Sequence, residues 1–244
     1  MNSQQLTFLI ARKRYSKCAN KLEAKIKEHG LSETLSEQII GIGVAADWVR
    51  RAAEMEDISY VGEQLNNSKR KASFVEVLRY GFAWFGLNAV FARPALLDFV
   101  GAPANSGEFE QFLVLFHATP LPDAATQTAD LVELLTAQVE SRLPHIPIGT
   151  SVSTLRALQT KYLSHIRPIR GRTAKAVAGA AVSGNVASLD LATLLYAFRN
   201  WSVHGNALDG CFGSRPGFLK YVGILQQVLA DVHVATATKL DARI

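Results

Sequence analysis

Residues 194–205 read Leu-Leu-Tyr-Ala-Phe-Arg-Asn-Trp-Ser-Val-His-Gly, and this stretch decides how the whole chain is interpreted. Apolar side chains recur in it and just before it at the i, i+3, i+4, i+7 spacing of a helix that packs one side into a core. They are Leu191, Leu194, Leu195, Phe198 and Trp201. We therefore expect a helix over about 188–204 that ends at Gly205, since glycine readily takes the left-handed conformation that terminates helices.

The same helical spacing recurs along the rest of the sequence, and no stretch alternates as a strand does. The fold class predicted from it is all-α, a helical bundle. The expected helices cover about 4–28, 33–57, 73–93, 107–117, 124–142, 153–166, 188–204 and 216–240, with ends uncertain by about two to four residues.

One polar segment, Asn66 to Lys71, lacks periodicity and is the best candidate for a linker. At 244 residues and 48% hydrophobic, the chain can bury a sizeable core and is long for one bundle. We therefore expect an N-terminal helical extension at 1–71 and one main helical domain at 72–244.

Three polar residues lie on the side of the 188–204 helix away from its apolar stripe. With Tyr196 as origin and about 100° per residue, Arg199 falls near −60°, Asn200 near +40° and His204 near +80°. The three side chains are therefore expected to face water, a cleft or a partner.

These residue types suit cleavage of RNA. Arginine offers a forked, permanently charged donor set for phosphate oxygens, and asparagine adds neutral hydrogen-bonding groups. Histidine moves protons near neutral pH, as attack of a ribose 2′-hydroxyl on its own phosphodiester requires. The sequence thus makes Arg199, Asn200 and His204 candidate catalytic residues, with no metal ion and no cofactor.

The pattern Arg199-Asn200-x-x-x-His204-Gly205 resembles the HEPN family (higher eukaryotes and prokaryotes nucleotide-binding domains). A second stretch, Arg79 to Arg93, is similar to the aromatic early helix of that family. The resemblance, over roughly residues 72–240, implies a homodimeric metal-independent endoribonuclease that leaves a 2′,3′-cyclic phosphate. It implies that Arg199 binds phosphate, that Asn200 supports it and that His204 is the acid and base. A toxin or antiviral defence role is implied, with an antitoxin or defence-system protein as a further partner.

Positive charge is unevenly distributed along this chain of net charge +5. No acidic residue occurs between Ser141 and Leu189, whereas seven Lys and Arg do. One-signed tracts attract polyphosphate backbones, although many are only solvated loops. The residues expected to bind RNA are Arg167, Arg170, Arg172 and Lys175.

Other features narrow the class of protein. Two distant cysteines, Cys18 and Cys211, provide neither a disulfide framework nor a metal-ligand cluster. The first residues lack a secretory signal, and the apolar run from Tyr80 to Ala92 is shorter than the roughly 20 residues that span a bilayer. We expect a cytoplasmic protein without membrane contact.

Two other interpretations remain open. The same surface is compatible with a HEPN-like regulatory module that binds a nucleotide or a partner without cleaving. It is also compatible with a scaffold in which Arg199 and His204 are structural. If two copies associate about a twofold axis, we expect the contact to include Ala192, Tyr196 and Val203.

Overall fold

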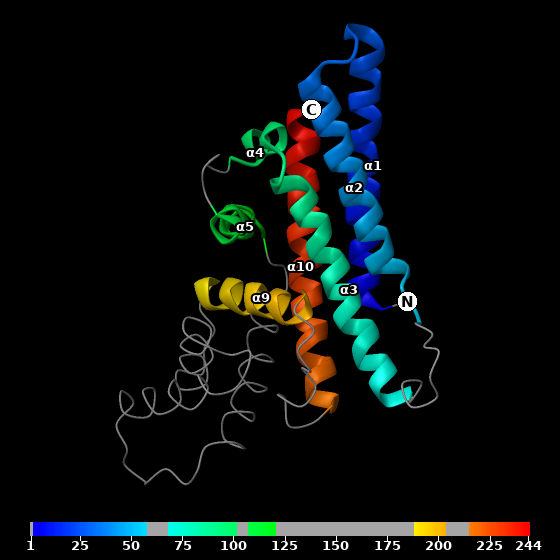
Figure 1. Cartoon of the computed structure of the whole chain (residues 1–244), viewed down its shortest axis with the longest axis vertical. Helices are drawn as coiled ribbons and strands as arrows, with labels where there is room; N and C mark the ends of the chain where they lie inside the picture. The colour runs from blue at the N-terminus through cyan, green and yellow to red at the C-terminus, as the bar shows by residue number, and fades with distance from the viewer. Residues whose placement is uncertain (1, 58–67, 102–106, 121–187, 204–214) are drawn as a thin grey trace, which may run out of the picture. The chain divides into compact units, whose positions relative to one another are not determined.

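The computed structural model describes residues 2–57, 68–101, 107–120, 188–203 and 215–244 (Figure 1). Every regular element in these ranges is an α-helix, which confirms the all-α prediction. The helices are α1 (Ser3–His29), α2 (Glu33–Glu54), α3 (Ser68–Phe91), α4 (Pro94–Val100), α5 (Glu108–His117), α9 (Ser188–Val203) and α10 (Arg215–Arg243).

Contacts divide the chain into two compact units. The first unit contains Met1–Leu121 and Gln226–Ile244, and the second contains Pro122–Leu225. The division therefore falls after Leu121 rather than at the predicted boundary at residue 71. The physical reason is that α1 and α2 share their buried surface with α3 and the C-terminal part of α10.

In the first unit, α1 and α10 run in the same direction with a constant register. Side-chain hydrogen bonds join Ser3 to Gln227 and Lys17 to Asp241, and both pairs are 224 positions apart. Arg14 bonds to Thr238 with the same separation. A separation that stays constant requires both helices to advance together, so α1 and α10 are parallel.

Helix α3 keeps a constant register with α10 as well. The Nε2 atom of Gln226 donates to the Glu76 carbonyl at 2.8 Å, and His233 contacts the Ala83 carbonyl at 2.7 Å. Both pairs are 150 positions apart. Helices α1, α3 and the C-terminal part of α10 therefore point the same way (Figure 1).

Helix α2 runs in the opposite direction to α3. Ala45 and Val49 of α2 lie beside Gly86, whereas the earlier Gly41 lies beside the later Ala89. This pairing of early with late positions is that of antiparallel helices. The first unit thus contains these four helices beside α4 and α5. Among the four, only α2 points downward in Figure 1.

Aromatic and aliphatic side chains fill the space between these helices. Phe8 and Tyr15 of α1, Trp84 of α3 and Leu229 of α10 have no exposed surface. The indole ring of Trp84 also packs on Phe112 of α5, with ring centroids 4.7 Å apart. Burial of such large apolar side chains, at about 1.5–3 kcal/mol each, is the main source of stability here.

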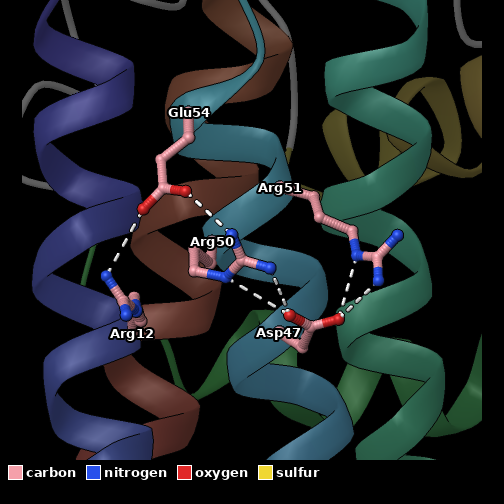
Figure 2. A network of polar contacts seen from close by, with 5 residues as sticks. All are labelled: Arg12, Asp47, Arg50, Arg51 and Glu54. Atoms are coloured by element: carbon pink, nitrogen blue, oxygen red, sulfur yellow. Dashed lines mark hydrogen bonds and ion pairs between the residues drawn. The ribbon is translucent and has the colours of Figure 1, made fainter.

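A polar network covers the outer surface where α1 meets α2 (Figure 2). Asp47 lies between Arg50 and Arg51, at 2.7 Å and 2.9 Å, and Glu54 lies between Arg50 and Arg12, at 2.9 Å and 3.4 Å. Hydrogen bonds from Arg50, and then from Arg51, lower the pKa of Asp47. The guanidinium of Arg51 also lies over the Trp48 ring, 5.0 Å from its centroid.

The predicted linker is wrong over most of its length. Helix α3 begins at Ser68, so residues 68–71 are helical. Lysine, arginine and alanine favour helices, and a polar helical turn has no apolar periodicity by which sequence reasoning would detect it. The helices expected at 124–142 and 153–166 lie outside the described residues.

Candidate functional site

Helix α9 carries the first part of the predicted catalytic motif, and its apolar side is buried as expected. Leu191, Leu194, Leu195 and Phe198 are between 0% and 4% exposed. The rings of Phe198 and Tyr221 contact each other within the second unit, with centroids 6.2 Å apart. The predicted core stripe is therefore confirmed for these four residues, while the side chain of Trp201 lies outside the description.

Arg199 lies half-buried near the C-terminal end of α9. Its guanidinium carbon lies 5.6 Å from the centroid of the Tyr196 ring, within the range of a cation–π contact. Its Nε atom is buried. The ring contact and the partial burial restrict the positions that this guanidinium can take.

Tyr196 is the residue whose role sequence reasoning missed. The sequence predicts Tyr196 at a contact between copies, but not as the support of Arg199. The signal was present, because residues three apart on a helix are neighbours and an aromatic ring beside an arginine forms a favourable pair.

The exposed face of α9 is shorter than predicted. Ala192 and Thr193 lie one to two turns before Arg199 and Asn200 on the same side, at about 100° per residue, and they are only 0% and 5% exposed. From Leu191 to Leu195 the helix is buried on all sides. A helix wheel assumes one buried side, and that assumption fails where a helix is enclosed.

This burial corrects one expected contact. Ala192 is completely buried within the chain, so it cannot lie at a surface shared with a second copy. Tyr196, which is half-buried, retains some surface for such a contact. The side chain of Val203 is outside the description.

The remaining predicted site residues cannot be placed beside Arg199. Asn200 lies within α9, but its side chain is not described. His204 and the four basic residues expected to bind RNA lie outside the described residues; these are Arg167, Arg170, Arg172 and Lys175. Of the proposed constellation, the structure therefore describes Arg199 and its contact with Tyr196.

Within the described part of the chain, no group of three or more His, Cys, Asp or Glu side chains is arranged to hold a metal ion. Among its helices, none combines the length and the apolar character needed to cross a membrane.

Comparisons with known proteins give no relative for this chain. No family model matches it, and neither the curated proteins nor the solved structures contain a match.

Proposed function

We propose that the chain is a metal-independent endoribonuclease of the HEPN type, a cytoplasmic toxin or antiviral effector that acts as a homodimer. The observation that carries this proposal is the position of Arg199, half-buried over Tyr196 where the enclosed part of α9 ends. An arginine already restricted in this way loses less side-chain entropy when it binds a phosphate. The spacing of Arg199, Asn200 and His204 supplies the other groups.

The proposed reaction is an internal phosphoryl transfer. An imidazole takes the proton from the ribose 2′-hydroxyl, and the 2′-oxygen forms a bond to phosphorus. The bond from phosphorus to the 5′-oxygen breaks, and that oxygen receives a proton from an imidazolium. Arg199 donates hydrogen bonds to the non-bridging oxygens, where negative charge develops. The products are a 2′,3′-cyclic phosphate and a 5′-hydroxyl.

A homodimer accounts for the two proton transfers. One His204 is the base and its counterpart in the second copy is the acid, if a twofold axis brings the two motifs into one cleft. Asn200 hydrogen-bonds the same phosphate, and Arg167, Arg170, Arg172 and Lys175 hold the flanking RNA. An antitoxin or a defence-system protein restrains or activates the enzyme.

Substitution of His204 tests this proposal. We expect His204→Ala to reduce RNA cleavage by about 10²–10⁴-fold, because proton transfer by a positioned side chain contributes about that much. Affinity for a non-cleavable 2′-O-methyl RNA should change far less, because Arg199 and the basic residues supply most of the phosphate contacts in the proposal. Cleavage of a labelled RNA and fluorescence anisotropy measure the two quantities.

The matched control is His29→Ala, which removes an exposed histidine near the end of α1. We expect it to cleave RNA as the unchanged protein does. The proposal is wrong if His204→Ala, folded as shown by its circular dichroism, cleaves at the rate of the control.

A second candidate is a module that binds RNA or a nucleotide without cleaving it. The same contact favours it, because an arginine held over an aromatic ring needs no acid or base to bind a phosphate. In that case the unchanged protein and His204→Ala bind the 2′-O-methyl RNA equally well, and neither cleaves RNA. Loss of binding in Arg199→Ala then identifies the surface.

A further inference from the structure

Helix α1 carries a strong excess of positive charge. Its 27 residues include seven Lys and Arg and only two Glu. Five of the cations follow one another along the outer surface of the helix, and we call them the α1 basic stripe: Lys13, Arg14, Lys17, Lys21 and Lys25. Three of them, Arg14, Lys17 and Lys21, contact α10. Four of the five side chains are exposed and Lys21 is half-buried.

The spacing of the stripe is regular. Lys13, Lys17, Lys21 and Lys25 recur every four residues, so successive lysines are about 6 Å apart along the axis and about 40° apart around it. The stripe therefore extends for about 18 Å along the helix and turns through about 120° around it. The core residues Phe8, Tyr15 and Leu22 lie on the inner side of the helix and are buried.

The stripe is poorly neutralised by the protein itself. Lys17 and Lys21 share one carboxylate, that of Asp241, at 2.8 Å and 2.7 Å. Their hydrogen bonds, that of Lys17 first, lower the pKa of Asp241. Arg14 bonds to the neutral hydroxyl of Thr238. Among the described residues, no carboxylate forms an ion pair with Lys13 or Lys25.

On the flank of α1 that faces α2, carboxylates of the protein neutralise the positive charge. There Arg12 forms an ion pair with Glu54, which also binds Arg50 (Figure 2). Charges on that flank are balanced between α1 and α2, whereas in the stripe two lysines share one carboxylate of α10. The stripe is therefore a surface for an external anion with many charges.

We infer that the α1 basic stripe binds the sugar-phosphate backbone of RNA, at a surface additional to the proposed catalytic motif. This inference depends on the proposed function for the identity of the polyanion. A stripe of about 18 Å is long enough for roughly five stacked nucleotides at about 3.4 Å each. Contacts of this kind carry no base specificity and weaken as salt is added.

An acidic lipid surface fits the stripe less well. The apolar side chains of α1 face the core, and Leu6 and Ile10 alone are large apolar residues exposed on this helix, at 52% and 42%. Helices that lie in a membrane interface present a continuous apolar face to the lipid. Two aliphatic side chains are too few for that, so RNA is the occupant that the surface favours.

The salt dependence of RNA binding tests the inference. The test variant is Lys13→Gln/Lys17→Gln/Lys25→Gln, which leaves Lys21 to pair with Asp241. The matched control is Arg12→Gln/Arg50→Gln/Arg51→Gln, which removes the same number of charges from the network of Figure 2. The probe is a fluorescent 20-nucleotide 2′-O-methyl RNA, and anisotropy is recorded from 50 to 300 mM KCl.

We expect the test variant to bind at least about tenfold more weakly near 100 mM KCl, with a log–log salt slope shallower by about two, since each phosphate contact contributes about 0.7 for a single strand. The control should change the slope by less than one. Equal slopes in the two variants overturn the inference. Binding of the unchanged protein to vesicles with 30% phosphatidylserine, lost in the test variant while RNA binding persists, overturns it as well.

The outcome for the proposed function is separate. A protein that binds the 2′-O-methyl RNA through the stripe, yet leaves unmodified RNA intact, overturns the endoribonuclease proposal and supports the stripe. If the unchanged protein cleaves RNA and the two variants have the same salt slope, the endoribonuclease proposal is supported and the stripe is overturned.

Discussion

At the scale of single residues, His233 shows how the interior of the first unit is organised. Its side chain has no exposed surface and lies between α1 and α3. The Nδ1 atom is 3.1 Å from the Tyr15 hydroxyl, and Nε2 is 2.7 Å from the Ala83 carbonyl. A carbonyl only accepts hydrogen bonds, so Nε2 carries the proton and the hydroxyl donates to Nδ1. Both ring nitrogens are satisfied with the ring neutral.

This burial makes the free energy of unfolding depend on pH. Burial lowers the pKa of His233 to about 4, from an ordinary value of about 6.5. Between these pH values the histidine is protonated in the unfolded chain but not in the folded chain. The free energy of unfolding therefore falls as the pH drops from 6.5 toward 4. We expect a loss of about 2–3 kcal/mol from this residue between pH 7 and pH 4.5, measured by urea unfolding.

The variant His233→Gln provides the comparison, because it cannot titrate. It should be less stable at pH 7, yet lose about 2–3 kcal/mol less than the unchanged protein on acidification. The exposed His29→Gln should follow the unchanged protein. If the free energy of unfolding falls with pH in parallel for His233→Gln and the unchanged protein, the claim that His233 is buried as a neutral ring is wrong.

Helix α9 shows which structural features can be predicted from single residues. Apolar periodicity predicted the burial of Leu194 and Phe198 correctly, because large apolar side chains are usually buried in folded proteins. It placed Ala192 on an open face, since a small residue carries little information about its surroundings. The contact of Arg199 with Tyr196 follows from local spacing, whereas the enclosure of α9 depends on tertiary packing.

At the scale of elements, the end of α1 was predicted from its capping glycine. Gly30 ends α1 with φ 82°, in accordance with the expected end near residue 28. Helix α4 was missed, although Pro94 occupies its first turn and Gly101, with φ 75°, ends it. Seven residues are too few to show apolar periodicity, so only the two end signals were available.

Two glycines of α2 test how closely the helices of the first unit pack. A Cβ atom at Gly41 would lie 2.6 Å from Arg93 Cδ and 3.1 Å from the Ala89 carbonyl oxygen. At Gly43 nothing lies within 4 Å. We expect Gly41→Ala to lower the free energy of unfolding by about 1–3 kcal/mol through crowding. Gly43→Ala should raise it by about 0.5–1 kcal/mol through helix propensity.

Urea unfolding of the two variants gives both values, and each variant serves as the control for the other. Opposite signs support the close approach of α2 to the end of α3. A gain in stability for Gly41→Ala equal to that of Gly43→Ala contradicts it.

At the scale of the whole molecule, the chain contains two compact units, to which we assign different functions. The first unit contains α1 to α5 and the C-terminal part of α10, and it carries the α1 basic stripe. The second contains α9, the helix that carries Arg199. Sequence reasoning predicted the all-α class because helical periodicity is local. It did not predict this division, because the pairing of α1 with α10 joins residues 224 positions apart.

The most direct test of the central claim is the chemistry of the RNA ends. The purified chain is incubated with a 5′-labelled RNA in excess EDTA, beside His204→Ala, and the product ends are analysed by mass spectrometry. We expect cleavage that persists in EDTA, 2′,3′-cyclic phosphate ends and 5′-hydroxyl ends, and no products from the variant. Products with 3′-hydroxyl ends, or cleavage that EDTA abolishes, would contradict the central claim.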